Sequence, residues 1–67
     1  MISESEIKEI KNCLKICEKG YSNETRMKFK YLIKMCSREI GGHIGEVTCY
    51  TCRRFVIGYW KKKLKLS

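Results

Sequence analysis

The chain has 67 residues and carries 15 lysines and arginines against seven acidic residues, a formal net charge of +8. This length allows one small domain, which buries only about 60 % of its unfolded surface and is marginally stable. Its apolar runs fall far short of the roughly 20 residues that span a bilayer, and its first residues carry acids where a secretory signal carries bases, so we expect a cytoplasmic protein without a transmembrane segment.

Residues 3–19 are expected to form the first helix of a single domain that covers residues 1–67. Ser3 or Ser5 can cap this helix, and Glu6 stands three residues after Ser3, as in a capping box. An apolar stripe at helical spacing consists of Ile7, Ile10, Leu14 and Cys17. Gly20 follows as a left-handed terminator.

Residues 23–40 are expected to form the second helix, capped by Ser22 or Asn23 and stopped by two glycines at 41 and 42. The apolar face is predicted to consist of Met27, Tyr31 (or Phe29 and Leu32), Met35 and Cys36, widened by Ile33 and Ile40. Lysines and arginines fall largely on the opposite face. No internal repeat interrupts this pattern.

Residues 49–64 are expected to form the third helix, after a glycine-containing linker and with Thr48 as its N-cap. The predicted apolar stripe consists of Cys49, Cys52, Val56, Tyr59 and Trp60, and Phe55 is also expected in the core. Gly58 inside this helix suggests a close helix–helix contact. The fold class is therefore all-α, a small three-helix domain with a CxxC at the start of its third helix.

The five cysteines favour metal binding or simple burial, because cytoplasmic thiols are normally reduced. One structural zinc is a candidate cofactor, since thiolates and imidazole bind zinc tetrahedrally. Two ligand sets are open: Cys36, His43, Cys49 and Cys52 across the linker, or Cys13, Cys17, Cys49 and Cys52. The alternative is that the cysteines pack as small apolar groups. Neither spacing is that of a standard zinc finger.

Catalysis finds little support in the sequence. There is one histidine and no aspartate, which excludes a Ser-His-Asp triad, and no phosphate-binding loop or small-molecule site is indicated. A CxxC at a helix N-terminus can be a reactive thiol pair. However, redox motifs of the thioredoxin type follow a strand in a larger α/β domain, for which this chain has no room. We expect a non-enzyme.

The positive charge is unevenly distributed. Residues 1–24 contain four lysines and five glutamates, a balance of −1, whereas residues 25–67 contain eleven lysines or arginines and two glutamates, a balance of +9. Such a field attracts polyanions. The candidate nucleic-acid-binding residues are Arg53, Arg54, Lys61, Lys62, Lys63 and Lys65, with aromatic residues interleaved. The partner is expected to be a nucleic acid or an acidic protein surface.

The segment from residue 38 to residue 63 resembles small CxxC-containing proteins of bacteriophages and mobile elements of Bacteroidetes. The matching residues are Gly41-Gly42, Cys49-Tyr50-Thr51-Cys52 and Arg53-Arg54-Phe55-Val56. The resemblance as a whole covers about half the chain. The resemblance implies a phage- or mobile-element-encoded accessory protein, as a virion component or in the host cytoplasm, without catalysis.

The sequence thus predicts a basic, non-enzymatic accessory module that binds nucleic acid. The alternative is a structural or protein-interaction component of a virion or host complex, and a minor alternative is a thiol redox protein. A homo-oligomer is compatible with either binding role, because three short helices leave apolar surface uncovered.

Overall fold

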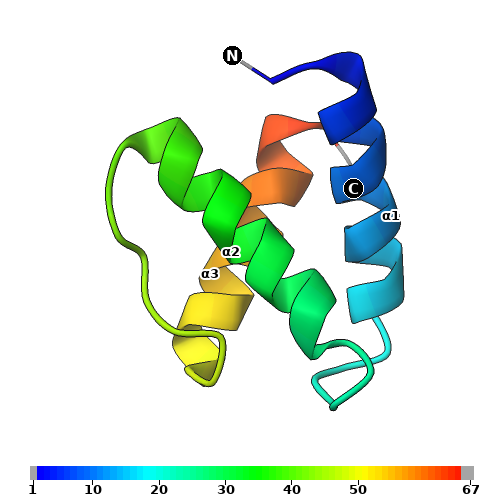
Figure 1. The fold of residues 1–67 in the computed structure, drawn as a ribbon, viewed down its shortest axis with the longest axis vertical. Coiled ribbons are helices and arrows are strands. Elements are labelled where there is room, and N and C mark those ends of the chain that lie inside the picture. Colours follow the sequence, from blue (N-terminus) through cyan, green and yellow to red (C-terminus); the bar gives the residue numbers. More distant parts are fainter. Residues whose placement is uncertain (1, 66–67) are drawn as a thin grey trace.

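The computed structural model describes residues 2–65, which form three α helices and no strand (Figure 1). Helix α1 spans Glu4–Cys17, α2 spans Arg26–Ile40 and α3 spans Tyr50–Lys63. This confirms the predicted all-α class and all three helices, which are two or three residues shorter than expected. Helix α2 packs against both α1 and α3. None of these helices is long and apolar enough to cross a membrane.

Helix α1 begins at a capping box. The Ser3 hydroxyl accepts a hydrogen bond from the backbone N–H of Glu6 at 3.3 Å, and the Glu6 carboxylate accepts one from the Ser3 N–H at 3.1 Å. The bond from the Ser3 N–H lowers the pKa of the Glu6 carboxyl, and so does the Arg38 guanidinium of α2, which lies 2.7 Å from it. The cap predicted from the sequence is therefore also a tie between α1 and the end of α2.

The other helix termini differ partly from the prediction. Gly41 ends α2 with a φ of 73°, as expected of a left-handed terminator. However, the N-cap of α2 is Thr25, whose hydroxyl donates to the Gly20 carbonyl at 2.7 Å, and not Ser22 or Asn23. The predicted Thr48 cap of α3 is also wrong, because Cys49 itself occupies the N-cap position. Both starts lie downstream of the predicted caps because the preceding residues form turns of their own.

One core joins the three helices. Its buried residues are Ile10, Cys13, Leu14 and Cys17 of α1, Phe29, Leu32, Ile33, Met35 and Cys36 of α2, Val56 and Trp60 of α3, and Val47 of the linker. The prediction was wrong for Met27, Ile40 and Phe55, which are 67 %, 49 % and 53 % exposed. Their helical phase suits the core, but they lie at helix ends or on flanks that no other helix covers.

Trp60 closes the core. Its side chain is fully buried, and its indole N–H donates to the Leu32 carbonyl of α2 at 3.1 Å. The indole therefore adds a directed polar contact to the apolar area that it removes from water. At the far end of α3, Lys63 lies 3.4 Å from Glu39 of α2. In addition to the core packing, α3 is thus joined to α2 by one buried hydrogen bond and one surface ion pair.

Replacing Trp60 with phenylalanine should lower the free energy of unfolding by about 1–3 kcal/mol, because the hydrogen bond is lost and a small void remains. Urea denaturation followed by far-UV circular dichroism measures this change. Phe55→Ala is the control, and its effect should stay below about 1 kcal/mol because that ring is largely exposed. Equal losses for the two variants would contradict the assigned packing.

Candidate nucleic-acid interface

One face of α3 carries a row of side chains that the helix spacing places together. Tyr50, Arg54, Ile57 and Lys61 follow one another at intervals of three or four residues, and Gly58 lies four residues after Arg54 and three before Lys61, so they share a face of the helix. Gly58 interrupts this row: a Cβ built there meets no atom within 4 Å. The predicted close helix contact at Gly58 is therefore wrong, and the missing side chain instead leaves a hollow.

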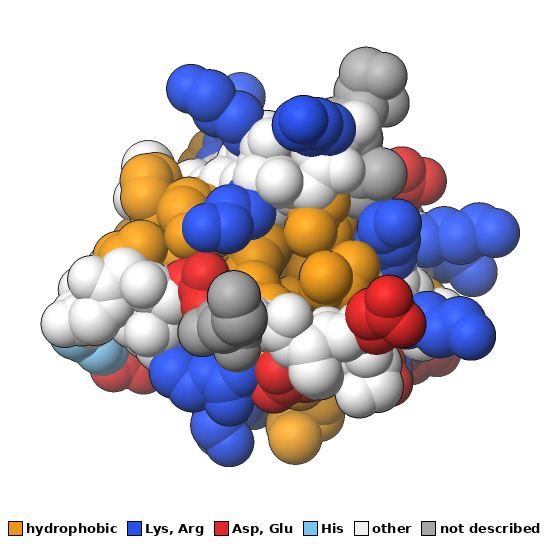
Figure 2. Space-filling model, turned by 90° about the horizontal axis from the view of Figure 1, so that it is seen from above, with side chains coloured by type: hydrophobic (Ala, Val, Ile, Leu, Met, Phe, Trp, Pro, Cys, Tyr) orange, Lys and Arg blue, Asp and Glu red, His pale blue; other side chains and the backbone are white. Residues whose placement is uncertain are grey.

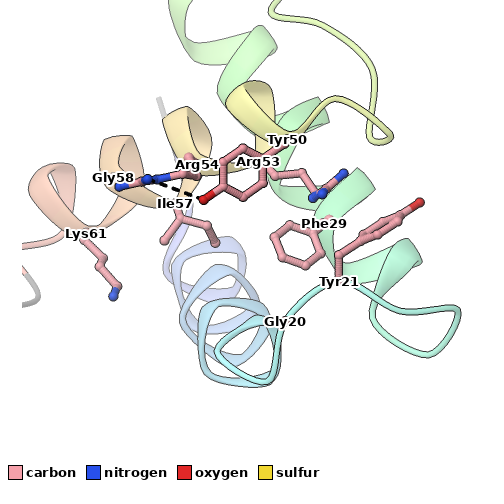
Figure 3. A pocket seen from close by; sticks show the side chains of 9 residues that line it. All are labelled: Gly20, Tyr21, Phe29, Tyr50, Arg53, Arg54, Ile57, Gly58 and Lys61. Carbon is pink, nitrogen blue, oxygen red and sulfur yellow. Dashed lines mark hydrogen bonds between the residues drawn. The ribbon is translucent and has the colours of Figure 1, made fainter.

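A groove of about 390 Å³ lies along this row (Figure 3). Its other side is formed by Gly20 and Tyr21, in the turn after α1, and by Phe29 of α2. Three cationic side chains and three aromatic rings line the groove, and among the described residues no carboxylate does. We call it the α3 groove; its lining residues are Gly20, Tyr21, Phe29, Tyr50, Arg53, Arg54, Ile57, Gly58 and Lys61.

Arg53 is held by contacts inside the molecule. Its guanidinium lies 4.0 Å from the centroid of the Tyr21 ring, and its Nη1 donates to the Val47 carbonyl at 2.8 Å. Figure 3 shows it reaching past Phe29 toward Tyr21. The sequence placed this arginine on an outward-facing binding surface. The structure gives it a packing role, joining α3 to the linker and to the first turn.

Arg54 and Lys61 remain available to a ligand. Arg54 is exposed, and within residues 2–65 its polar contact is to Tyr50 one helical turn earlier, with its Nη1 at 3.4 Å from the hydroxyl (Figure 3). Tyr50 is itself 62 % exposed. Lys61 lines the other end of the groove, two helical turns away. An exposed ring with one cation beside it can stack on a base, while that cation and a second one further along the groove neutralise phosphates.

The remaining predicted cations lie beyond the groove. Lys62 and Lys65 are exposed, and among residues 2–65 neither has a recorded salt-bridge partner. Lys63 pairs with Glu39. The structure therefore divides the six candidates: two line the groove freely, two extend the positive surface toward the chain end, and Arg53 and Lys63 are engaged with other parts of the protein.

Neither Tyr21 nor Phe29 is among the binding residues expected from the sequence, so this side of the groove was missed. Tyr21 packs edge-on to Phe29, with ring centroids 5.8 Å apart. The sequence does contain a signal here, because the aromatic Tyr21 directly follows Gly20 at the end of the first predicted helix. That pattern cannot predict which distant helix the ring will face, since this depends on tertiary packing.

Neither predicted zinc set is assembled among the residues that the structure describes, since no three histidine, cysteine, aspartate or glutamate side chains are placed to hold a metal ion. Cys13, Cys17 and Cys36 are buried, whereas Cys49 and Cys52 are half-buried. His43 is exposed and shares a surface hollow with Cys52. Zinc binding remains a prediction that elemental analysis would test.

The cysteines also differ in acidity. Burial raises the pKa of the Cys13, Cys17 and Cys36 thiols to about 11. In contrast, hydrogen bonds from Cys52 and Thr51 lower the pKa of Cys49 to about 7. Three thiols thus behave as packing groups, and one has the acidity of a reactive group.

No protein-family model, curated protein or solved structure matches this chain. The functional assignment therefore rests on the geometry of the site.

Replacing Arg53 with glutamine should lower the melting temperature and cost about 1–3 kcal/mol of stability, because the carbonyl of Val47 and the ring of Tyr21 lose their charged partner. The matched variant Arg54→Gln removes the same charge from an exposed position and should leave stability within about 0.5 kcal/mol of the parent. The measurement is the thermal unfolding of both variants and the parent protein in the same buffer. An unchanged melting temperature for Arg53→Gln would refute its packing role.

Proposed function

We propose that this protein is a non-enzymatic module that binds nucleic acid through the α3 groove. The observation that carries the proposal is the combination, in one groove, of exposed aromatic surface at Tyr50 with the cations Arg54 and Lys61. Phosphate contacts supply most of the affinity in such sites, and stacking on an aromatic ring accepts any base. The surrounding net charge of +8 favours association with a polyanion.

The groove suits unpaired nucleotides better than duplex. Tyr50 stands at the first turn of α3, where its ring reaches the surface beside Arg54. In a duplex the base faces are stacked on one another, so this ring has no face to meet. Lys62 and Lys65 continue the positive surface past the groove and give the backbone of a strand further contacts.

The resemblance to small phage and mobile-element proteins supports the same proposal, because an accessory protein of that kind acts near nucleic acid. We accordingly propose a phage- or mobile-element-encoded protein that works in the host cytoplasm or the virion.

Binding is tested by fluorescence anisotropy with a labelled single-stranded oligonucleotide of about 12 nucleotides. Affinity should fall steeply as salt rises. The double variant Arg54→Gln/Lys61→Gln should reduce the slope of log K against log salt by about 1.4, which corresponds to two phosphate contacts at about 0.7 each for a single strand.

The matched control is Lys8→Gln/Lys11→Gln, which removes the same charge from exposed positions of α1 that do not line the groove. Its slope should stay close to that of the parent protein. The proposal fails if the parent shows no binding at low salt, or if the two double variants lose affinity equally.

A second candidate function, protein assembly, is favoured by an apolar patch elsewhere. Ile40 and Phe55 are about half exposed and line one hollow with Ile44, and the Phe55 ring stacks on Tyr59 at 6.4 Å. Hydrophobic side chains also reach the surface at the end of the molecule where α1 begins, with charged groups around them (Figure 2). Such patches mark contacts with a second copy or another protein.

Native mass spectrometry of the untagged protein tests assembly. If the patch pairs two copies, a dimer should appear and Phe55→Ser should shift it to monomer without loss of helicity. A monomer throughout the micromolar range would exclude self-assembly through Phe55.

A further inference from the structure

The two half-buried cysteines occupy a special pair of positions. Cys49 is the N-cap of α3 and Cys52 is the third residue of the helix, so they stand where Ser3 and Glu6 stand in α1. In α1 these two side chains face each other and exchange hydrogen bonds with the backbone. In α3 no side-chain hydrogen bond caps the helix, because a protonated thiol is a weak acceptor.

Loss of a proton turns Cys49 into an effective cap. Its Sγ lies 3.1 Å from the Thr51 hydroxyl, and its pKa is lowered to about 7 by hydrogen bonds from the Cys52 and Thr51 side chains and from their backbone N–H groups. The first turn of α3 thus presents several donors to one sulfur. A thiolate at this position also meets the positive end of the helix dipole.

The two sulfurs have different neighbours. The Cys52 thiol lies beneath the linker, where it donates to the Ile44 carbonyl at 3.8 Å, and a side chain at Gly45 would collide with its sulfur. Its pKa is raised, mainly by its hydrogen bond to Cys49 and then by burial, with Glu46 adding a further negative charge. Both cysteines are half-buried and Cys52 lines a surface hollow, so the donors around the Cys49 sulfur, and not access, make Cys49 the sulfur that attacks first.

We propose that Cys49 and Cys52 form a thiol–disulfide exchange site that accepts low-molecular-weight disulfides. The side chains of Cys49 and Cys52 are hydrogen-bonded to each other, so the two sulfurs are already neighbours, and a disulfide needs a Cβ–Cβ separation of about 3.5–4.5 Å. A small movement of the first turn of α3 therefore closes the bond. This site does not depend on the proposed nucleic-acid binding, and the helix terminus supplies the reactive thiolate without the α/β domain that the sequence lacks.

The reaction has two balanced steps. The Cys49 thiolate attacks one sulfur of the disulfide, forming a mixed disulfide and releasing one thiolate, which takes a proton from water. Cys52 then gives its proton to water and attacks the Cys49 sulfur, forming the Cys49–Cys52 disulfide and releasing the second thiol. The protein dithiol is oxidised by two electrons, and the small disulfide is reduced to two thiols.

Glutathione disulfide is the probe, with products read by intact mass and peptide mapping. The reduced protein should acquire a Cys49–Cys52 disulfide and no lasting adduct, while Cys13, Cys17 and Cys36 stay reduced because they are buried. Cys52→Ser should stop at one glutathione adduct on Cys49. Cys49→Ser, which keeps a good N-cap residue, should form neither product.

Alkylation gives a second readout. In the reduced parent protein, iodoacetamide should modify Cys49 well before Cys13, Cys17 and Cys36, because those three thiols are buried. Adducts spread over all five cysteines of the parent protein would overturn the proposal, as would equal alkylation rates of Cys49 and the three buried cysteines. Both measurements use the parent protein, so they decide even if a variant fails to fold.

Discussion

The position of Arg53 governs much of the functional surface. Its guanidinium joins three segments that are distant in sequence: the ring of Tyr21 after α1, the carbonyl of Val47 in the linker, and α3 itself. A planar cation suits this position, because its face covers an aromatic ring while its edge donates to a carbonyl. The wall of the α3 groove and the approach of the linker to Cys52 both follow from this placement.

The same contact explains how a small basic domain tolerates its charge. Cations that repel one another lower the stability of a compact state, and this chain relieves part of that repulsion through paired groups. Arg38 binds Glu6 and Lys63 lies beside Glu39, while Arg53 finds an aromatic partner. Of the remaining cations, Arg54, Lys61, Lys62 and Lys65 lie on α3 or just after it, and the others are spread over the first half of the chain.

Local signals in the sequence predicted the helices well. The Ser3–Glu6 cap, the Gly41 stop and the periodicity of Ile10, Leu14 and Trp60 are each complete within one segment, and the structure confirms them. The core assignment was wrong for Met27 and Phe55, because periodicity describes a helix face but not whether another helix covers it.

The candidate site was predicted only in part, for the same reason. Arg54 and Lys61 belong to one helix and were predicted from the concentration of positive charge and aromatic residues in it. Tyr21 enters the groove only through the folding of the first turn against α2 and α3, and Arg53 changed its assignment because a ring from another segment lies over it. The sequence likewise does not show which cysteines are buried, and the structure finds Cys13, Cys17 and Cys36 in the core.

Gly58 has a consequence for the evolution and engineering of this domain. It is exposed in the interior of α3, and nothing near it forbids a methyl group. Glycine at such a site gives up about 1 kcal/mol relative to alanine, a large share of the margin available to so short a chain. Selection for thermal stability alone would therefore replace Gly58 with a residue that has a side chain, and each such variant would have a shallower α3 groove. Whether natural variants keep or lose this glycine would indicate whether the groove or the stability of the helix has mattered more to the organism.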